Sequence, residues 1–351
     1  MRTTRATIAV MVLAAACGPR DASPPPQTPA ARSEEKPAPP PASPSELSHG
    51  EAPVGSGGAE PRVEPDAPAR TPGRVKRIRL EMTHRNVTIA PNVQYAAWTF
   101  GDRVPGPALR VAIGDTVDFT LVNAAPIPHS LDFHAAEVAP SRVYTNVNPG
   151  DSLHYRWVAK VPGAFMYHCG TAPVAQHIAN GMYGAIIVDP KPSLRPAREF
   201  VFVQSEFYGH KADTAGTLLG LDWQKLLSLA PDYVVFNGHS NEYATHPLQV
   251  RPNELLRMYV VNAGPNRVSA FHVVGAIFDR VYLDGATDRP LRGIQTVNVP
   301  VGGGAVFELR LPEPGTYPFV THAFADATKG GVGMLQARAP GDTTTVPAAA
   351  H

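Results

Sequence analysis

The chain has 351 residues, 43% of them apolar, and a formal net charge of +1. This length and composition can build a sizeable hydrophobic core, in about two domains. The near balance of charge gives no support to nucleic-acid binding, for which a basic patch would be expected. The chain has only two cysteines, and each has a separate explanation, so we expect no disulfide.

Residues 1–17 have the features of a bacterial targeting segment. Arg2 and Arg5 precede a short apolar run at residues 6–16. This run is too short to span a bilayer, which takes about 20 apolar residues. It ends in LAAAC, which is similar to a lipoprotein cleavage site with alanine where leucine is usual. We therefore expect Cys17 to be the lipidated first residue of the mature chain. The alternative is an ordinary secretory signal with a chance cysteine.

Residues 18–73 are rich in proline, alanine, serine and glutamate and contain little that could be buried. The prolines predict a disordered but semi-extended tether. Residues 340–351 are predicted to form a disordered tail for the same compositional reason. The lipid at Cys17 would then be the chain's only attachment to a membrane.

The part between tether and tail divides into two halves of similar pattern, residues 74–192 and 193–339. Both contain short runs in which apolar and polar residues alternate, separated by glycine and proline. LVNAAPIPHSLDFH in the first half matches VVNAGPNRVSAFHVVG in the second, and VPGAFMYH matches EPGTYPFVTH. These repeats predict an all-β fold of two tandem Greek-key β-sandwiches. The only helix that we expect lies near residues 222–229, before Pro231.

The first half contains a set of residues with metal-binding chemistry: His129, Cys169, His177 and Met182. Two imidazoles, one thiolate and one thioether are the ligands of a type 1, blue-copper electron-transfer centre. Each residue type alone is more often a buried core residue or a hydrogen-bonded histidine. Their combination in this order favours the copper centre.

A second set, Asp132, His134 and His168, is interleaved with the first. Because a strand sends successive side chains to opposite faces, the adjacent residues His168 and Cys169 cannot easily serve one metal. They can serve two. The same alternation places Asp132 together with His134 and puts His129 on the opposite face.

The internal repeat places His322 of the second half at the position equivalent to the His168–Cys169 turn. Three neutral imidazoles, from His134, His168 and His322, would leave an open coordination position, which is typical of a catalytic metal. Zinc could occupy such a site. Copper is favoured because it heads the affinity order for nitrogen ligands, and because only a redox metal would use the link to Cys169.

These motifs carry a resemblance that runs from about residue 74 to about residue 339. It depends on IPHSLDFHAA, TNVNPG, YHC, HIANGMYGAIIV, YVVFNGH, SAFHVVGAIFDRVYL and FVTHAF. The sequence resembles the copper-containing nitrite reductases, in particular the outer-membrane lipoprotein type found in Neisseria. The resemblance implies a homotrimer of subunits with two cupredoxin domains, exported to the periplasm or outer membrane of a Gram-negative bacterium. It also implies two coppers per subunit and an electron donor such as a small cytochrome c or cupredoxin.

The resemblance also assigns roles to residues. Type 1 copper would be held by the four ligands already named, and type 2 copper by His134 and His168 with His322 of a neighbouring subunit. Asp132 and His272 would be the catalytic acid and base. Reduction of nitrite to nitric oxide and water takes one electron and two protons, so the site needs a metal and proton-delivering groups. The electron would enter at type 1 copper and pass through Cys169 and His168.

The sequence departs from the family pattern at three positions. Ser130 stands where asparagine is common and is expected to hydrogen-bond to the loop that holds the cysteine. Val274 replaces isoleucine above the type 2 site, which removes about one methylene, worth up to ~0.8 kcal/mol of contact. Glu137 lies in a loop that usually has threonine and glycines, and it could bring a carboxylate near the anion pocket. The remaining histidines are expected to be surface or structural: His49, His84, His154, His210, His239, His246 and His351.

Two other functions are compatible with parts of the pattern. A two-domain multicopper oxidase would need several His-x-His pairs and a His-Cys-His segment, and this sequence has neither. A membrane-tethered electron carrier would keep type 1 copper without a working type 2 site. We expect the reductase, with about two coppers per chain rather than about one or about four.

Overall fold

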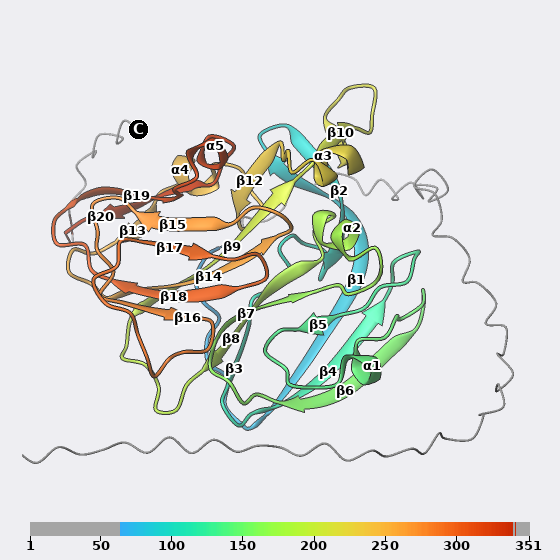
Figure 1. Cartoon of the computed structure of the whole chain (residues 1–351), viewed down its shortest axis with the longest axis horizontal. Coiled ribbons are helices and arrows are strands. Elements are labelled where there is room, and N and C mark those ends of the chain that lie inside the picture. The colour runs from blue at the N-terminus through green and yellow to red at the C-terminus, as the bar shows by residue number, and fades with distance from the viewer. Residues whose placement is uncertain (1–63, 340, 342–351) are drawn as a thin grey trace, which may run out of the picture. The chain divides into compact units, whose positions relative to one another are not determined.

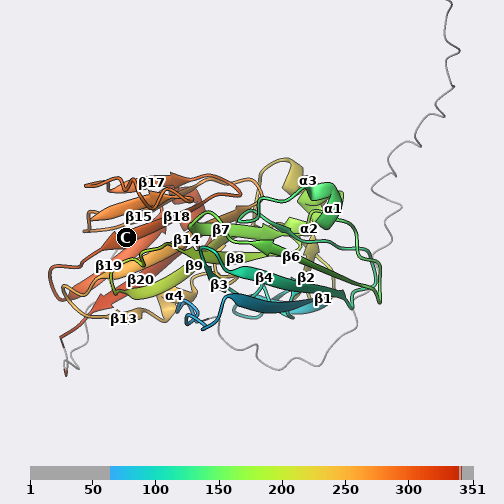
Figure 2. The same ribbon diagram turned by 90° about the horizontal axis from the view of Figure 1, so that it is seen from below.

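The computed structural model describes residues 64–339 and residue 341. The predictions for the targeting segment, Cys17, the tether up to residue 63 and most of the tail concern residues outside this range. The described part consists of four β-sheets with five short helices at their edges. Figures 1 and 2 show the first-half strands and the second-half strands as two groups lying side by side. The predicted all-β class is confirmed.

Two sheets are built mainly from the first half. The larger has the strand order β10-β11-β2-β1-β4-β6 and the smaller the order β3-β8-β7-β5. Apolar alternation drives this arrangement: along β4 every second residue is buried, as the sequence predicts. The strands are β1 Val75–Ala90, β2 Val93–Phe100, β3 Leu109–Ala112, β4 Thr116–Asn123, β5 Asp132–Phe133, β6 Ser152–Val158, β7 Gly163–His168, β8 Tyr183–Asp189, β10 Gly209–Lys211 and β11 Leu218–Leu221.

The other two sheets come from the second half, with the strand orders β12-β9-β14-β18-β16 and β13-β20-β19-β15-β17. They enclose a core rich in phenylalanine, including Phe271, Phe307 and Phe319. The strands are β9 Arg198–Phe207, β12 Tyr233–Phe236, β13 Leu248–Val250, β14 Leu256–Gly264, β15 Ser269–Val273, β16 Arg280–Leu283, β17 Thr296–Val299, β18 Gly304–Leu309, β19 Gly315–Thr321 and β20 Val332–Ala337.

The halves share a third apolar cluster, in which Met166 and Ile187 of the first half lie with Val201 and Tyr259 of the second. The strand pairing also crosses between them, because β11 lies parallel to β2 in the first-half sheet. Residues 64–73, which we expected to belong to the tether, lie against the folded part: the backbone N–H of Ala67 donates to the carbonyl of Glu199. The halves therefore pack as one body. The domain boundary predicted between residues 192 and 193 remains a prediction.

A network of buried ion pairs lies where the two halves meet. The Arg110 guanidinium on β3 contacts Asp189 at the end of β8 and Glu199 on β9, each at 2.8 Å. On the second-half side, Arg257 contacts both Glu199 and Glu308. Glu308 alternates with apolar residues along β18, yet it is fully buried, because that face of β18 lies against β7 of the neighbouring half. Each buried carboxylate is paired, as burial of charge requires.

One helix was expected, and α3 (Trp223–Leu227) confirms it. Its N-terminal cap is Asp222, whose carboxylate accepts a hydrogen bond from the Lys225 N–H at 2.9 Å. Four more short helices were not expected. They have four to six residues and no side-chain cap, so no 3.6-residue period develops in the sequence. They are α1 Pro140–Val143, α2 Val174–Ala179, α4 Glu242–Thr245 and α5 Phe324–Ala327. None of the helices in residues 64–339 is long and apolar enough to cross a membrane.

Candidate metal centres

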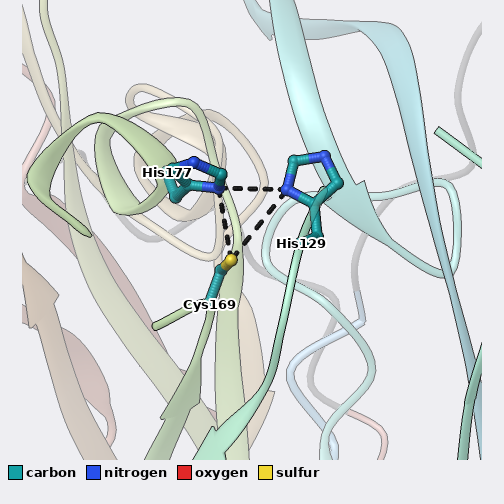
Figure 3. Close-up of side chains that lie close together, drawn as sticks. All are labelled: His129, Cys169 and His177. Atoms are coloured by element: carbon teal, nitrogen blue, oxygen red, sulfur yellow. Dashed lines mark hydrogen bonds between the residues drawn. The ribbon is translucent and has the colours of Figure 1, made fainter. Parts of the chain in front are cut away.

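The first donor group joins His129, Cys169 and His177 (Figure 3). Cys169 Sγ lies 3.2 Å from His177 Nδ1 and 3.9 Å from His129 Nδ1, and the two Nδ1 atoms are 3.0 Å apart. Ligand atoms that lie about 2.0–2.3 Å from one ion are at most a little over 4 Å from each other. The three donors therefore fit a single metal ion.

The backbone fixes these donors from three segments. His129 exchanges two backbone hydrogen bonds with Val147, and Cys169 directly follows β7. The Ser130 N–H points at the Cys169 sulfur, 3.3 Å away. The Ser130 hydroxyl oxygen accepts hydrogen bonds from the Gly170 N–H at 3.0 Å and from the Thr171 hydroxyl at 3.1 Å. The prediction that Ser130 secures the cysteine loop is confirmed.

His177 and Met182 return to the site on the segment after Cys169. His177 lies on α2, and residues 180–182 connect this helix to β8. Met182 is fully buried. Its N–H donates to the His177 carbonyl, and its own carbonyl accepts the Cys169 N–H at 3.0 Å. Met182 is thus tied by its backbone to two of the donors, and its role as axial ligand remains a prediction.

The histidines of the first group are held in the neutral form that binds metals. Burial lowers the pKa of His177 to about 4, with a smaller effect from His84. Burial, and then the neighbouring imidazoles of His177 and His84, lower the pKa of His129 to about 2. At neutral pH both rings therefore offer a free lone pair.

The second donor group joins Asp132, His134 and His168. Asp132 on β5 pairs directly with His168 on β7 in an antiparallel ladder, so their side chains share one face. The Nε2 atoms of His134 and His168 are 3.0 Å apart, and an Asp132 oxygen lies 4.0 Å from His168 Nε2. Burial lowers the pKa of His168, which keeps this ring neutral as well.

Both rings of the second group are oriented by backbone carbonyls. His168 Nδ1–H donates to the Cys169 carbonyl at 2.9 Å, and His134 Nδ1–H donates to the Gly302 carbonyl at 3.0 Å. Because a neutral imidazole carries one proton, these bonds leave the two Nε2 atoms unprotonated and facing each other. Gly302 belongs to the second half, so the neighbouring sandwich positions a donor of the first.

The expected separation of neighbouring side chains is confirmed. His168 lies in the second group and Cys169 in the first, although the residues are adjacent in sequence. His129 lies on the first group's side, and Asp132 and His134 on the other, as strand alternation predicts. One peptide bond therefore joins the two donor groups.

His272 and His322 lie together in the second half, with ring centroids 5.4 Å apart. His272 Nδ1–H donates to the Gln295 carbonyl at 2.7 Å, which leaves its Nε2 unprotonated. His322 follows β19 and is exposed beside Phe324. Among residues 64–339 the structure records no contact between this pair and the second donor group. Within one chain, His322 is therefore not placed to act as a type 2 copper ligand, and His272 is not placed beside Asp132.

Glu137 and Val274, two of the departures from the family pattern, lie in different places. The Glu137 carboxylate lies 3.1 Å from Lys160 Nζ in an ion pair in which both side chains are about 60% exposed. It is outside the second donor group. Val274 is partly buried and lies in the turn that directly follows β15, two residues after His272.

Sequence reasoning missed two residues at the first group, His84 on β1 and Trp98 on β2. His84 was expected to be surface or structural, but it is only 7% exposed, and its Nε2 lies 3.1 Å from His129 Nε2. The Trp98 ring stacks on His84. The sequence signal was weak, because neither residue lies near a ligand in the chain. The other described histidines outside the site lie away from both groups; His154, His210 and His246 are exposed.

Comparison with known proteins identifies the class first. The sequence pattern described as multicopper oxidase matches residues 81–193, a range that contains both donor groups. Paired β-sandwiches with a His, Cys and His donor group at a sheet end define the cupredoxin class of copper proteins.

Individual relatives narrow the class. The copper-containing nitrite reductase of Neisseria meningitidis serogroup B is 40% identical over 282 residues, which are 79% of this chain and 71% of that protein. The enzyme of the same description from Neisseria gonorrhoeae is 39% identical over 339 residues, 94% of this chain and 86% of its own length. The solved copper nitrite reductase from Nitrosomonas europaea superposes with a TM-score of 0.70 at 36% identity, covering 75% of this chain and 94% of that chain. The chain belongs to the copper-containing nitrite reductases, and the resemblance predicted from its motifs is confirmed.

Proposed function

We propose that this chain reduces nitrite to nitric oxide and water, with one electron and two protons, using copper at both donor groups. The observation that carries the proposal is the adjacency of His168 and Cys169 in two separate donor groups. An electron-transfer site and a substrate site joined by one peptide bond suit a one-electron reduction.

The residues of both groups fit copper. The first combines a thiolate with two imidazoles, the mixture that suits both oxidation states of copper, and the second offers two unprotonated Nε2 atoms. When bound, copper would supply one-electron redox chemistry at the first group and a Lewis-acidic, redox-active binding point for nitrite at the second.

Protons would be delivered by Asp132 and His272. The half-buried Asp132 lies beside His168, where its carboxyl can hold a proton next to a nitrite oxygen. His272 Nδ1–H donates a hydrogen bond to the Gln295 carbonyl. Its Nε2 atom can therefore accept a proton and pass it on. Val274, two residues after His272, would limit how nitrite lies in the pocket.

The active site would be completed by a second copy of the chain in a homotrimer. His322 is exposed, and Phe324 beside it is 57% exposed, although it is a large apolar side chain. In the trimer, His322 of one subunit would become the third type 2 ligand of its neighbour, and His272 would approach that neighbour's Asp132. Burial of Phe324 would favour the contact.

The mature protein would be an exported lipoprotein of a Gram-negative bacterium, located in the periplasm or anchored to the outer membrane through Cys17. Its electron donor would be a small protein such as a cytochrome c or a cupredoxin. Both proposals rest on the targeting segment and on the similarity to the Neisseria enzymes.

A carboxylate from Glu137 in the second donor group would favour the electron-carrier alternative. Because this carboxylate is paired with Lys160 on the surface, it gives no reason to expect a disabled site. The reductase is therefore the better account of the second group.

The direct test is a nitric oxide electrode measurement on copper-loaded protein with nitrite and an artificial reductant. The proposal expects nitric oxide formation and about two coppers per chain. About one copper and no nitric oxide would support the carrier instead. About four coppers with oxygen consumption would support an oxidase. His134→Ala is the matched variant, expected to keep the type 1 colour and to lose nitric oxide formation.

A further inference from the structure

His84 lies directly behind one donor of the first group. Its Nε2 is 3.1 Å from His129 Nε2, the ring atom remote from the Nδ1 that faces Cys169 and His177. Both imidazoles are buried, with His129 fully inaccessible. His84 therefore cannot reach the same metal ion as a fourth donor, and its contact is with the ligand.

The chemistry of the contact follows from proton counting. When His129 binds a metal through Nδ1, the single proton of its neutral ring must be on Nε2. That N–H can only donate, so His84 Nε2 must accept, and the proton of His84 must then be on its Nδ1.

The position of His84 is fixed by Trp98. The two residues are direct partners in the β1–β2 ladder. Their rings stack with centroids 5.1 Å apart and planes inclined by 7°. The same indole meets His129 and His177 edge-on, with centroids 5.5 and 4.8 Å away. Trp98 thus packs against His84, the hydrogen-bond acceptor, and against His129 and His177, the two imidazole ligands of the first group.

We propose that His84 is a positioning residue of the type 1 copper centre, which accepts the His129 Nε2–H and thereby sets the balance between the two oxidation states of the metal. The inference rests on the proposed function only in requiring copper at the first group. It is independent of nitrite and of the second group.

The physical reason is the effect of a hydrogen bond on the ligand. An acceptor at Nε2–H draws the proton away, places more negative charge on the ring, and makes Nδ1 a stronger donor. A stronger donor stabilises Cu(II) more than Cu(I). Removal of the acceptor should therefore shift the equilibrium toward Cu(I).

The test compares three variants with the wild-type protein. His84→Phe keeps a flat ring against Trp98 but removes the acceptor, whereas His84→Gln keeps a carbonyl oxygen that can accept. The control is His154→Phe on β6 of the same sheet, where an exposed imidazole contacts Asp118. Copper-loaded proteins are equilibrated with redox mediators at fixed pH, and the oxidised centre is followed by its visible absorption.

For His84→Phe we expect the Cu(I)-to-Cu(II) ratio at a given mediator potential to rise about tenfold. This is about 59 mV for a one-electron couple. His84→Gln should move the ratio less, and His154→Phe not at all. An unchanged ratio in His84→Phe, with the visible band intact, would overturn the inference, as would equal shifts in His84→Phe and His84→Gln.

A second measurement tests the inference if the His84→Phe variant folds poorly. In a His84→Leu protein, whose smaller side chain also lacks an acceptor, the hyperfine coupling of the remote His129 nitrogen, measured by electron–nuclear double resonance, should change while Cys169 remains bound. Unaltered coupling there would also contradict the inference. Absence of any thiolate–copper band in the wild-type protein would instead refute the copper assignment of the first group, which separates the two failures.

Discussion

His168 and Cys169 are neighbours in the chain, yet their side chains take part in different donor groups. His168 Nε2 lies 3.0 Å from His134 Nε2, whereas Cys169 Sγ lies 3.2 Å from His177 Nδ1. The alternation of side chains along β7 produces this separation. The shortest covalent path between the two groups is therefore one peptide unit and two side chains.

Asp132→Asn should lower nitrite turnover by about 10²-fold or more, because an amide cannot transfer a proton to substrate. Copper content and visible colour should stay the same, since Asp132 is not a predicted ligand. Steady-state nitric oxide production checks the rate, and the exposed Asp151→Asn is the control. A wild-type rate in Asp132→Asn would exclude this carboxylate from proton delivery.

Met182→Leu should change the colour and reduction potential of the type 1 centre while copper remains bound. The reason is that an axial thioether is a weak ligand that tunes the metal without holding it. Visible and electron paramagnetic resonance spectra measure the effect. Met258→Leu, a fully buried methionine of the second-half core, should leave both spectra unchanged. Identical spectra in wild type and Met182→Leu would mean that the axial ligand is wrongly assigned.

Gly302→Ala should weaken type 2 copper by about tenfold, because the Gly302 carbonyl orients His134. Gly302 has φ +77°, and a Cβ atom there would lie 3.3 Å from His134 Cε1, so the loop must shift. Gly293→Ala imposes a similar backbone strain at φ +66° with no atom near its Cβ. Copper titration of both variants, with the type 1 colour as internal reference, measures the difference. Equal copper loss in both would contradict the prediction.

Arg110→Met should destabilise the folded protein by about 3 kcal/mol, because it leaves the buried Asp189 and Glu199 carboxylates less well paired. Chemical denaturation at neutral pH measures this value. Arg156→Met is the control, since the exposed Arg156 pairs with Asp118 at the surface and should change the midpoint little. A midpoint equal to wild type in Arg110→Met would show that the two buried ion pairs of Arg110 do not stabilise the folded protein.

The same substitution should change acid unfolding. Burial alone would raise the pKa of Asp189, but hydrogen bonds from Arg110 and Arg70 outweigh burial and lower it. The ionised carboxylate therefore contributes stability above its ordinary pKa, and this contribution is lost as pH falls through the lowered value. Without Arg110, unfolding should begin at higher pH. An acid-unfolding curve of Arg110→Met that coincides with wild type would contradict this.

Much of the site could be predicted from the sequence, because its geometry follows from strand periodicity. Alternation along a strand is local, so residue spacing alone separates His168 from Cys169 and places Asp132 with His134. The ligand types in the first group were equally informative, since one thiolate with two imidazoles and a thioether is the ligand set of type 1 copper.

The remaining features depend on tertiary pairing, which has no local signal. His84 meets Trp98 through the β1–β2 ladder and reaches His129 across 45 residues of chain. The Gly302 carbonyl meets His134 across 168 residues of chain. The alternating pattern of β18 would place Glu308 on a polar face of the strand. It is buried because the other half covers that face.

The most direct test of the account is the electron paramagnetic resonance spectrum of the copper-loaded variants His168→Ala and Cys169→Ala. We expect His168→Ala to keep the type 1 signal and lose the type 2 signal, and Cys169→Ala to lose type 1 and keep type 2. If both substitutions remove the same signal, the two neighbouring side chains serve one metal, and the proposed path from one centre to the other does not exist.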